Sequence, residues 1–149
     1  MIKNDLSVFC DGGARGNPGP AAIGFVVFQN ERIVHKFSKR IGEATNNVAE
    51  YRAVIAALTW LIDKPSIINH KQSLLLRNQS SIINFYLDSL LIVNQLKGNF
   101  KIKNFNLQKL IVRAKNTERK IKGEVNYSYI PRRQNKIADA LVNQSLNSL

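Results

Sequence analysis

The stretch LSVFCDGGARGNPGPAAIGFVVF, residues 6–28, decides how this chain folds. Residues 6–10 form a short apolar run, and residues 22–28 form a second one with β-branched side chains, as buried strands do. The segment between them is rich in glycine and proline, which interrupt strands and form turns. It lacks the Gly-Lys-Ser/Thr ending of a phosphate-binding loop, and a strand follows it instead of a helix. We therefore expect two antiparallel strands, joined by a hairpin connection, at the start of a β-sheet.

The next segments extend this sheet and then cover it. A turn at residues 29–32 leads to residues 33–39, which alternate apolar and polar side chains as a half-exposed strand does. The first three strands thus predict an antiparallel meander. After a predicted loop at residues 41–45, good N-cap residues precede a helix over residues 48–62. That helix is apolar almost all round, which predicts its burial between two layers.

The second half of the chain alternates between strand and helix patterns. We expect strands at residues 82–87 and 125–130, helices at residues 90–96, 104–122 and 136–146, and a loop at residues 131–135. The order βββαβααβα is typical of an α/β protein whose mixed sheet is covered by helices. Residues 64–81 show apolar clumps without a clear period, so an insertion with a short helix and an extended loop both remain open. The length predicts a single domain over residues 1–149.

The composition restricts the classes of function. The chain carries 22 Lys and Arg against 10 Asp and Glu, and its formal charge of +12 attracts nucleic acid or an anionic membrane, although a generically basic protein would show the same excess. No apolar run approaches the roughly 20 residues that span a bilayer. The single cysteine, Cys10, excludes an intramolecular disulfide and a cysteine-based zinc site. We interpret it as a small buried strand residue, which fits a cytoplasmic protein.

Four carboxylates stand at the ends of predicted elements. Asp11 follows the first strand, Asp88 follows the fourth, and Glu50 and Asp139 lie in the first turns of two helices. Taken singly, each has a plainer role, because Asp11 could form a turn and the other acids could complement a helix dipole. If the first and fourth strands are parallel neighbours, however, one pocket gathers all four. Clustered carboxylates repel one another unless a cation holds them, so the pattern predicts a metal site.

Four blocks of this sequence resemble the signature blocks of the ribonuclease H type 1 family. They are CDGGARGNPGPAAIGFVV, TNNVAEYRAVIAAL, YLDSLLIVNQLKGNFKIKN and PRRQNKIADALVNQSL, and they follow the order of the family. The resemblance covers most of the chain except residues 64–81, and it is greatest to the compact archaeal and Gram-positive-like branch. It implies the ribonuclease H-like fold, in which helices flank a five-stranded mixed sheet of three antiparallel and two parallel strands.

The resemblance also implies an activity and a cofactor. The family hydrolyses the RNA strand of RNA–DNA hybrids and leaves a 5′-phosphate and a 3′-hydroxyl. Asp11, Glu50, Asp88 and Asp139 match its catalytic, metal-binding acids, which hold two Mg²⁺ ions for which Mn²⁺ can substitute. By resemblance, Asp11 bridges both ions, Glu50 and Asp88 lie on the leaving-group side, and Asp139 lies near the attacking water. Without metal, the acids should raise one another's pKa values.

Further residues match positions that contact the hybrid in the family. Small residues after Asp11 let the backbone approach the substrate, three asparagines match readers of the minor groove, and Thr45 matches a contact to a DNA-strand phosphate. Lysines near residues 97–103, including Lys103, suggest an electrostatic grip, although a solvated surface would look the same. The predicted substrate-binding residues are Gly12, Gly13, Asn17, Thr45, Asn46, Asn47, Ser89, Lys97, Phe100, Lys101, Arg132 and Arg133.

The chain also departs from the family pattern. Leu90 stands where the family usually carries glutamine, and the loop PRRQNK lacks the histidine of many bacterial members. We interpret His35 and His70 as surface residues, and we expect Arg132 or Arg133 to hold a phosphate instead. The basic protrusion of some relatives is missing. We expect a monomer that binds RNA–DNA hybrids and no membrane, and we keep two alternatives open, namely cleavage of double-stranded RNA and a non-catalytic hybrid-binding module.

Overall fold

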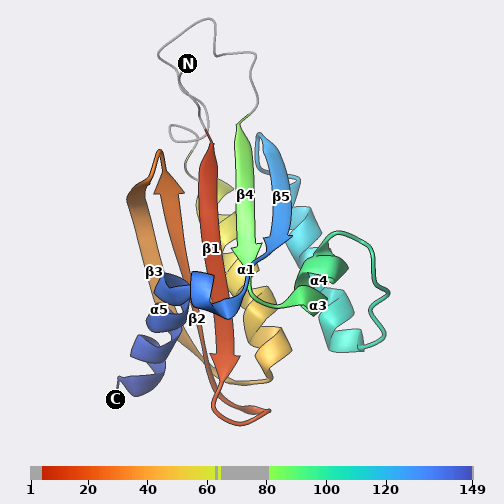
Figure 1. The fold of residues 1–149 in the computed structure, drawn as a ribbon. Helices are drawn as coiled ribbons and strands as arrows, with labels where there is room; N and C mark the ends of the chain where they lie inside the picture. The colour runs from red at the N-terminus through yellow and green to blue at the C-terminus, as the bar shows by residue number, and fades with distance from the viewer. Residues whose placement is uncertain (1–4, 63, 65–80, 149) are drawn as a thin grey trace, which may run out of the picture.

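The computed structural model describes residues 5–62, 64 and 81–148, and in this part of the chain the strands form one mixed sheet (Figure 1). The strands are β1 (Leu6–Ala14), β2 (Gly19–Gln29), β3 (Arg32–Ala44), β4 (Ile82–Leu87) and β5 (Glu124–Tyr129), in the spatial order β3-β2-β1-β4-β5. The first three strands are antiparallel, whereas β4 pairs in parallel with β1 and β5 pairs in parallel with β4. The predicted fold class is therefore confirmed, and β1 and β4 end on the same edge.

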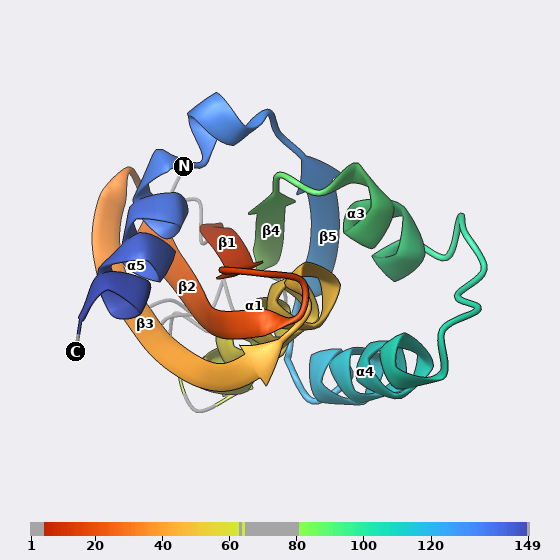
Figure 2. The same cartoon turned by 90° about the horizontal axis from the view of Figure 1, so that it is seen from below.

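Helices cover both faces of this sheet (Figures 1 and 2). They are α1 (Asn46–Ile62), α3 (Leu90–Leu96), α4 (Phe105–Glu118) and α5 (Lys136–Asn147), with a short 3₁₀ helix (Arg132–Gln134) before α5. The first of them, α1, packs on β1 and β2 and is covered by α4, which explains why its sequence is apolar almost all round. The last helix, α5, packs on the opposite face against β2, β1 and β3.

Three strands are longer than the sequence pattern predicts. The second begins at Gly19 instead of Ala22 and ends one residue later than predicted. The first continues past Cys10 to Ala14, so that its glycines pair with β2, with Gly12 opposite Ile23. The third continues through residues predicted as a loop, because Gly42, at φ +80°, lets the strand bulge at Ile41 and resume its pairing. Glycine has a low strand propensity, so the sequence hides pairing that tertiary contacts enforce.

Glycines also allow the helices to approach the sheet closely on both faces. A Cβ added at Gly12 would lie 2.3 Å from the carbonyl carbon of Ala49 and 2.5 Å from the backbone nitrogen of Glu50. On the other face, a Cβ at Gly24 would lie 2.9 Å from Cβ of Leu141 in α5. Side chains larger than hydrogen would therefore push away the two helices that carry Glu50 and Asp139.

The apolar core lies between the sheet and α1. Leu6, Val8 and Cys10 of β1 are fully buried there with Phe85 of β4, so Cys10 has the environment predicted for it. A smaller cluster, formed by Ala22, Val142 and Leu146, lies under α5. No helix within the described ranges is long and apolar enough to cross a membrane.

Two predictions concern residues whose structure is not described. The insertion or extended loop expected over residues 64–81 falls largely on residues 65–80, which lie outside the described residues, and so does His70. The other histidine, His35, is described. It is half-buried on β3 and stacks on the ring of Trp60 with 4.4 Å between the centroids, so it is less of a surface residue than predicted.

Candidate metal centre and nucleic-acid interface

Three carboxylates converge where the parallel pairing of β1 with β4 ends, beside the beginning of α1, and β1 itself continues past Asp11 instead of ending there as predicted. Asp11 belongs to β1, Asp88 directly follows β4, and Glu50 lies one turn inside α1 and not in its first turn as predicted. One oxygen from each of these carboxylates lies within 4.8 Å of the other two. Asp11 and Glu50 are buried, at 4% and 8% exposure. The parallel pairing of β1 with β4 brings together residues that are far apart in the sequence.

The fourth acid, Asp139, lines the same pocket but stands apart from these three. It lies in the first turn of α5, and its Oδ1 accepts a hydrogen bond from the guanidinium of Arg132 at 3.1 Å. Asn143 donates to its other oxygen at 3.4 Å. The pocket has a volume of about 460 Å³ and includes all four acids in its lining. The structure therefore gathers the predicted quartet as a close trio with Asp139 at the rim.

The trio is electrostatically strained without a cation. Burial, followed by repulsion from Asp88 and Asp139, raises the pKa of Asp11 to about 7. Burial and the charges of Asp11 and Asp88 also raise the pKa of Glu50 well above its ordinary value. Arg132 opposes both shifts, but its charge does not cancel them. The expectation that clustered acids raise one another's pKa is met at Asp11 and Glu50.

The donor set fits a hard divalent cation. Within the described part of the chain, the buried Oε2 of Glu50 has no hydrogen-bond partner, so one oxygen of this carboxylate is left uncompensated. The backbone N–H of Gly12 donates to Oδ1 of Asp11 at 3.0 Å and holds that carboxylate in place. Carboxylate oxygens of this kind are the ligands that Mg²⁺ and Mn²⁺ prefer.

A residue that sequence analysis missed, Asn135, connects the site to its supports. This buried side chain donates from Nδ2 to Oδ2 of Asp88 at 3.0 Å and to the carbonyl oxygen of Cys10 at 2.8 Å. Sequence analysis placed Asn135 in a loop and gave it no role. Its position immediately before α5, four residues ahead of Asp139, was the available signal.

The predicted minor-groove readers meet at the mouth of the pocket. The backbone N–H of Asn46 donates to Oδ1 of Asn17, and the N–H of Ala14 donates to Oδ1 of Asn46, both at 2.9 Å. Each amide oxygen is thus used to hold the β1–β2 connection against α1, and the NH₂ groups take no part in these two hydrogen bonds. Asn47 lines the pocket beside them.

The N-cap chemistry predicted before the first helix is carried by Thr45. Its Oγ1 accepts from the backbone N–H of Val48 at 3.2 Å. Ser89 plays the same part for α3, accepting from Ile92 at 3.3 Å, and it also lines the pocket. Beside it, Leu90 is 56% exposed, so the position where the family usually carries glutamine faces solvent.

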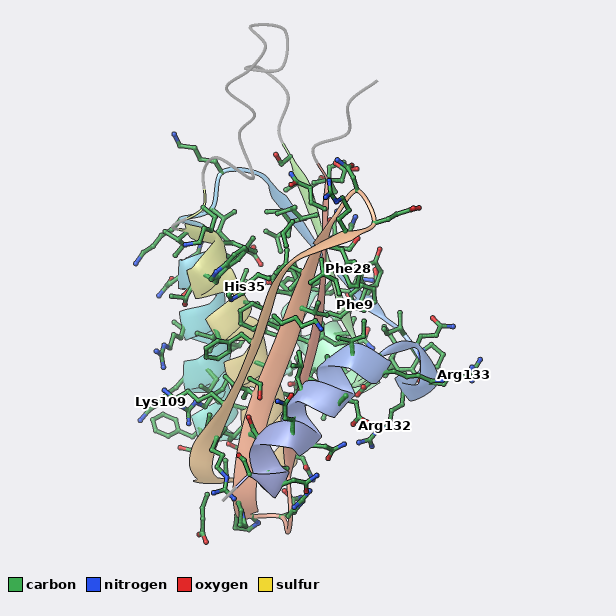
Figure 3. All side chains as sticks on the ribbon, turned by 90° about the vertical axis from the view of Figure 1, so that its left-hand side faces the viewer. Phe9, Phe28, His35, Lys109, Arg132 and Arg133 are labelled. Carbon is green, nitrogen blue, oxygen red and sulfur yellow. The ribbon has the colours of Figure 1, made fainter. Side chains whose placement is uncertain are left out.

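The other predicted substrate-binding residues divide into two groups. Gly12, Gly13 and Arg132 line the pocket, and Figure 3 shows that Arg132 and Arg133 extend in different directions from the turn before α5. Arg133 lines a separate cavity of about 270 Å³ that includes Phe9 and Phe28. The remaining residues lie outside the pocket. They are on the β1–β2 connection, immediately before α1, and on the exposed segment between α3 and α4, namely Asn17, Thr45, Lys97, Phe100 and Lys101.

The fold and the site together define a ribonuclease H-like protein, with a mixed sheet, helices on both faces, and acids at the carboxyl ends of two adjacent parallel strands. Residues 3–147 match the model of the RNase H family, and the chain belongs to that family. Its similarities are to type 1 enzymes, as the sequence resemblance predicts.

Individual relatives support the assignment. The chain is 37% identical over 145 residues to Ribonuclease HI of Halobacterium salinarum, with 95% of this chain and 64% of that protein covered. It is 36% identical to a bifunctional protein of Mycobacterium tuberculosis, with 93% of this chain and 34% of that protein covered. The chain therefore spans about a third of the mycobacterial protein and just under two thirds of the halobacterial one.

Solved structures give the same picture. The crystal structure of RNase H1 from Halobacterium salinarum matches with a TM-score of 0.82 at 34% identity, covering 96% of this chain and 98% of that one. LC11-RNase H1 in complex with an RNA/DNA hybrid matches with a TM-score of 0.80 at 34% identity, covering 95% and 96%.

Proposed function

We propose that this protein is a metal-dependent endonuclease that hydrolyses the RNA strand of RNA–DNA hybrids. The observation that carries the proposal is the buried trio of Asp11, Glu50 and Asp88, with Asp139 at the rim of the same pocket. A protein with a formal charge of +12 that buries acids together has a site for cations inside a surface that attracts polyanions. Membership of the RNase H family and the likeness to a hybrid-bound relative support the same activity.

The acids define where the metal would be held. Asp11, Glu50 and Asp88 would supply the shared ligands, and Asp139 would complete the set once it is released from Arg132. Two bound Mg²⁺ ions, or Mn²⁺ in their place, would activate the attacking water and stabilise the departing 3′-oxygen. We infer that the products carry a 5′-phosphate and a 3′-hydroxyl. The side chain of Arg132 is 76% exposed, so its guanidinium can also turn to a substrate phosphate.

The choice of the RNA strand follows from donors at the mouth of the pocket. The NH₂ groups of Asn17 and Asn46 can donate to 2′-hydroxyls and to acceptor atoms on base edges in the minor groove. The backbone at Gly13 carries no side chain that would keep the substrate at a distance, whereas a side chain at Gly12 would meet α1. The 2′-hydroxyl is the group that tells RNA from DNA, so these donors would place the RNA strand over the acids.

The decisive test is cleavage of end-labelled substrates with Mg²⁺. We expect the wild type to cut the RNA strand of a hybrid, EDTA to abolish cleavage, and Asp11→Asn to lower kcat by at least about a hundredfold, a loss typical of removing transition-state electrostatics. Asp5→Asn, a matched charge change just before the same strand, should cleave normally.

Parallel substrates separate the alternatives. Full activity of Asp11→Asn, or cleavage that needs no metal, would reject the proposal. Comparable cutting of double-stranded RNA would instead indicate a broader nuclease. Tight hybrid binding by the wild type without any turnover would indicate a binding module, although buried acids that repel phosphate give such a module no advantage.

A further inference from the structure

The residue that begins α5 does not cap its own helix. Asn135 occupies the N-cap position, where asparagine ordinarily accepts a hydrogen bond from the helix backbone, yet its side chain makes no capping bond. The caps of the two preceding helices behave in the ordinary way, because Ser89 accepts from Ile92 and Asn104 accepts from Leu107. Asn135 is also only 1% exposed. Its amide is therefore turned into the molecule, away from the helix that it could stabilise.

The contacts of this amide fix its orientation. Nδ2 donates to the carbonyl oxygen of Cys10 at 2.8 Å and to Oδ2 of Asp88 at 3.0 Å. Both partners are acceptors only, so the NH₂ group and not the amide oxygen must face them. Within the described residues the buried Oδ1 has no hydrogen-bond partner, which is a further cost of this placement. Because this side chain neither caps the helix nor pairs its Oδ1, we look for its role in the two hydrogen bonds that Nδ2 donates.

We propose that Asn135 is a positioning residue, which orients Asp88 so that this carboxylate can share a divalent cation with Asp11 and Glu50. The inference rests on the proposed metal-dependent function. In the described part of the chain, the bond from Asn135 is the hydrogen bond that holds the Asp88 side chain. It is made to Oδ2, one of the two carboxylate oxygens of Asp88. Groups that hydrogen-bond to metal-binding side chains orient them in this way.

The chemistry of an amide suits this role better than that of a cation. A neutral NH₂ group fixes a carboxylate without adding positive charge beside the site where a cation binds. Arg132, in contrast, pairs with Asp139 through a full charge that opposes metal binding until it moves away. The amide is also short and buried, so it holds one geometry at a small cost in side-chain entropy.

The backbone of Asn135 adds a second link. Its carbonyl oxygen accepts from the backbone N–H of Asp139 at 3.0 Å, which is the first hydrogen bond of the helix that carries the fourth acid. One residue thus joins β1 at Cys10, the carboxylate that follows β4, and the first turn of α5. Asn135 thereby fixes the spacing between Asp88, the end of the strand that carries Asp11, and Asp139.

The test compares Asn135→Ala with Asn104→Ala, which removes the same residue type from the same N-cap position on α4. Mn²⁺ titrations by isothermal calorimetry, with melting temperatures measured with and without Mg²⁺, give readouts independent of cleavage. We expect Asn135→Ala to raise the Mn²⁺ dissociation constant by about tenfold or more, and to reduce the gain in melting temperature from Mg²⁺. Asn104→Ala should lower the melting temperature but keep the wild-type dissociation constant.

Kinetics give a second readout. The Mg²⁺ concentration for half-maximal hybrid cleavage should rise in parallel for Asn135→Ala, with the KM for hybrid changed less than twofold. Asn135→Ser retains a residue that caps helices well, so it remains folded if the alanine variant does not, and its hydroxyl cannot supply both donor bonds. Asn135→Ser should show the same weakening of Mn²⁺ binding as Asn135→Ala.

The outcomes distinguish the inference from the function on which it rests. If the wild type binds Mn²⁺ and cuts hybrid while both Asn135 variants bind Mn²⁺ as tightly as the wild type, Asn135 is only structural and the inference is wrong. If the wild type neither binds Mn²⁺ nor cuts hybrid, the proposed function itself fails.

Discussion

At the scale of single residues, the site stores unfavourable charge that metal binding would relieve. In the folded chain the pKa of Asp11 is raised to about 7, whereas in an unfolded chain an aspartate has a pKa of about 3.9. The folded state therefore binds more protons than the unfolded state, and its stability falls as pH rises from about 4 through about 7. Glu50 shifts in the same direction.

The prediction is that Asp11→Asn stabilises the metal-free protein at high pH. In EDTA at pH 8, the free energy of unfolding of Asp11→Asn in urea should exceed that of the wild type by roughly 2–4 kcal/mol. This difference should be smaller at pH 5 and absent below about pH 4. Adding Mg²⁺ at pH 8 should raise the stability of the wild type but not that of the variant. Asp5→Asn serves as the control, and an Asp11→Asn protein less stable than the wild type in EDTA at pH 8 would contradict the prediction.

Residue-scale roles differ in how far the sequence could predict them. The four acids were found because each stands in its own block at the end of an element. The partner of Asp88 was not found, since Asn135 lies 47 residues further along the chain and only the folded sheet brings the two together. Likewise the sequence could not choose between Arg132 and Arg133, because adjacent residues in a short 3₁₀ helix extend in different directions.

At the scale of elements, the position of α1 depends on one missing side chain. Gly12→Ala would place a methyl group 2.3 Å from the backbone of Ala49, so α1 must move together with Glu50. We expect the free energy of unfolding to fall by about 3 kcal/mol or more, the upper end of the cost of overpacking. The reason is that the added methyl group meets backbone atoms and not a flexible side chain.

Gly13→Ala is the matched control on the same strand. Its Cβ would meet Cγ1 of Val142 at 3.7 Å, an ordinary contact, so it should cost less than about 1 kcal/mol. Urea unfolding of both variants measures the difference. If Gly12→Ala and Gly13→Ala were equally stable, α1 would not pack against β1 as closely as the structure shows.

The same glycines explain which elements the sequence predicted well. Strands and helices with strong periodicity, such as β4 and α1, were predicted within about two residues of their bounds. The ends of β1 and β3 were not, because Gly12, Gly13 and Gly42 are typical of turns in sequence while pairing with β2 in the fold. The start of β2 and the end of α4 also differ from the prediction, by three and four residues. Local propensity is a weak guide where a neighbouring strand supplies the hydrogen bonds.

At the scale of the whole molecule, the order of strands and helices follows the sequence prediction, and charge is distributed unevenly around it. The acids gather at one edge of the sheet, while the exposed lysines Lys97 and Lys101 lie on the segment between α3 and α4. Lys120 and Lys122 are also exposed but lie after α4, just before β5 begins. Because β4 and β5 are parallel, that end of the sheet is opposite the end where Asp88 lies.

This arrangement predicts where a hybrid would be gripped. Each lysine that neutralises a phosphate adds about 0.9 to the magnitude of the slope of log K against log salt. In an Asp11→Asn background, which prevents cleavage, the double variant Lys97→Ala/Lys101→Ala should make the slope shallower by about 1–2. Lys120→Ala/Lys122→Ala removes the same charge and should leave the slope nearly unchanged. Fluorescence anisotropy of a labelled hybrid over a series of salt concentrations measures the slopes of both double variants. If Lys120→Ala/Lys122→Ala changed the slope more than Lys97→Ala/Lys101→Ala, the hybrid would instead be bound by the lysines at the other end of the sheet.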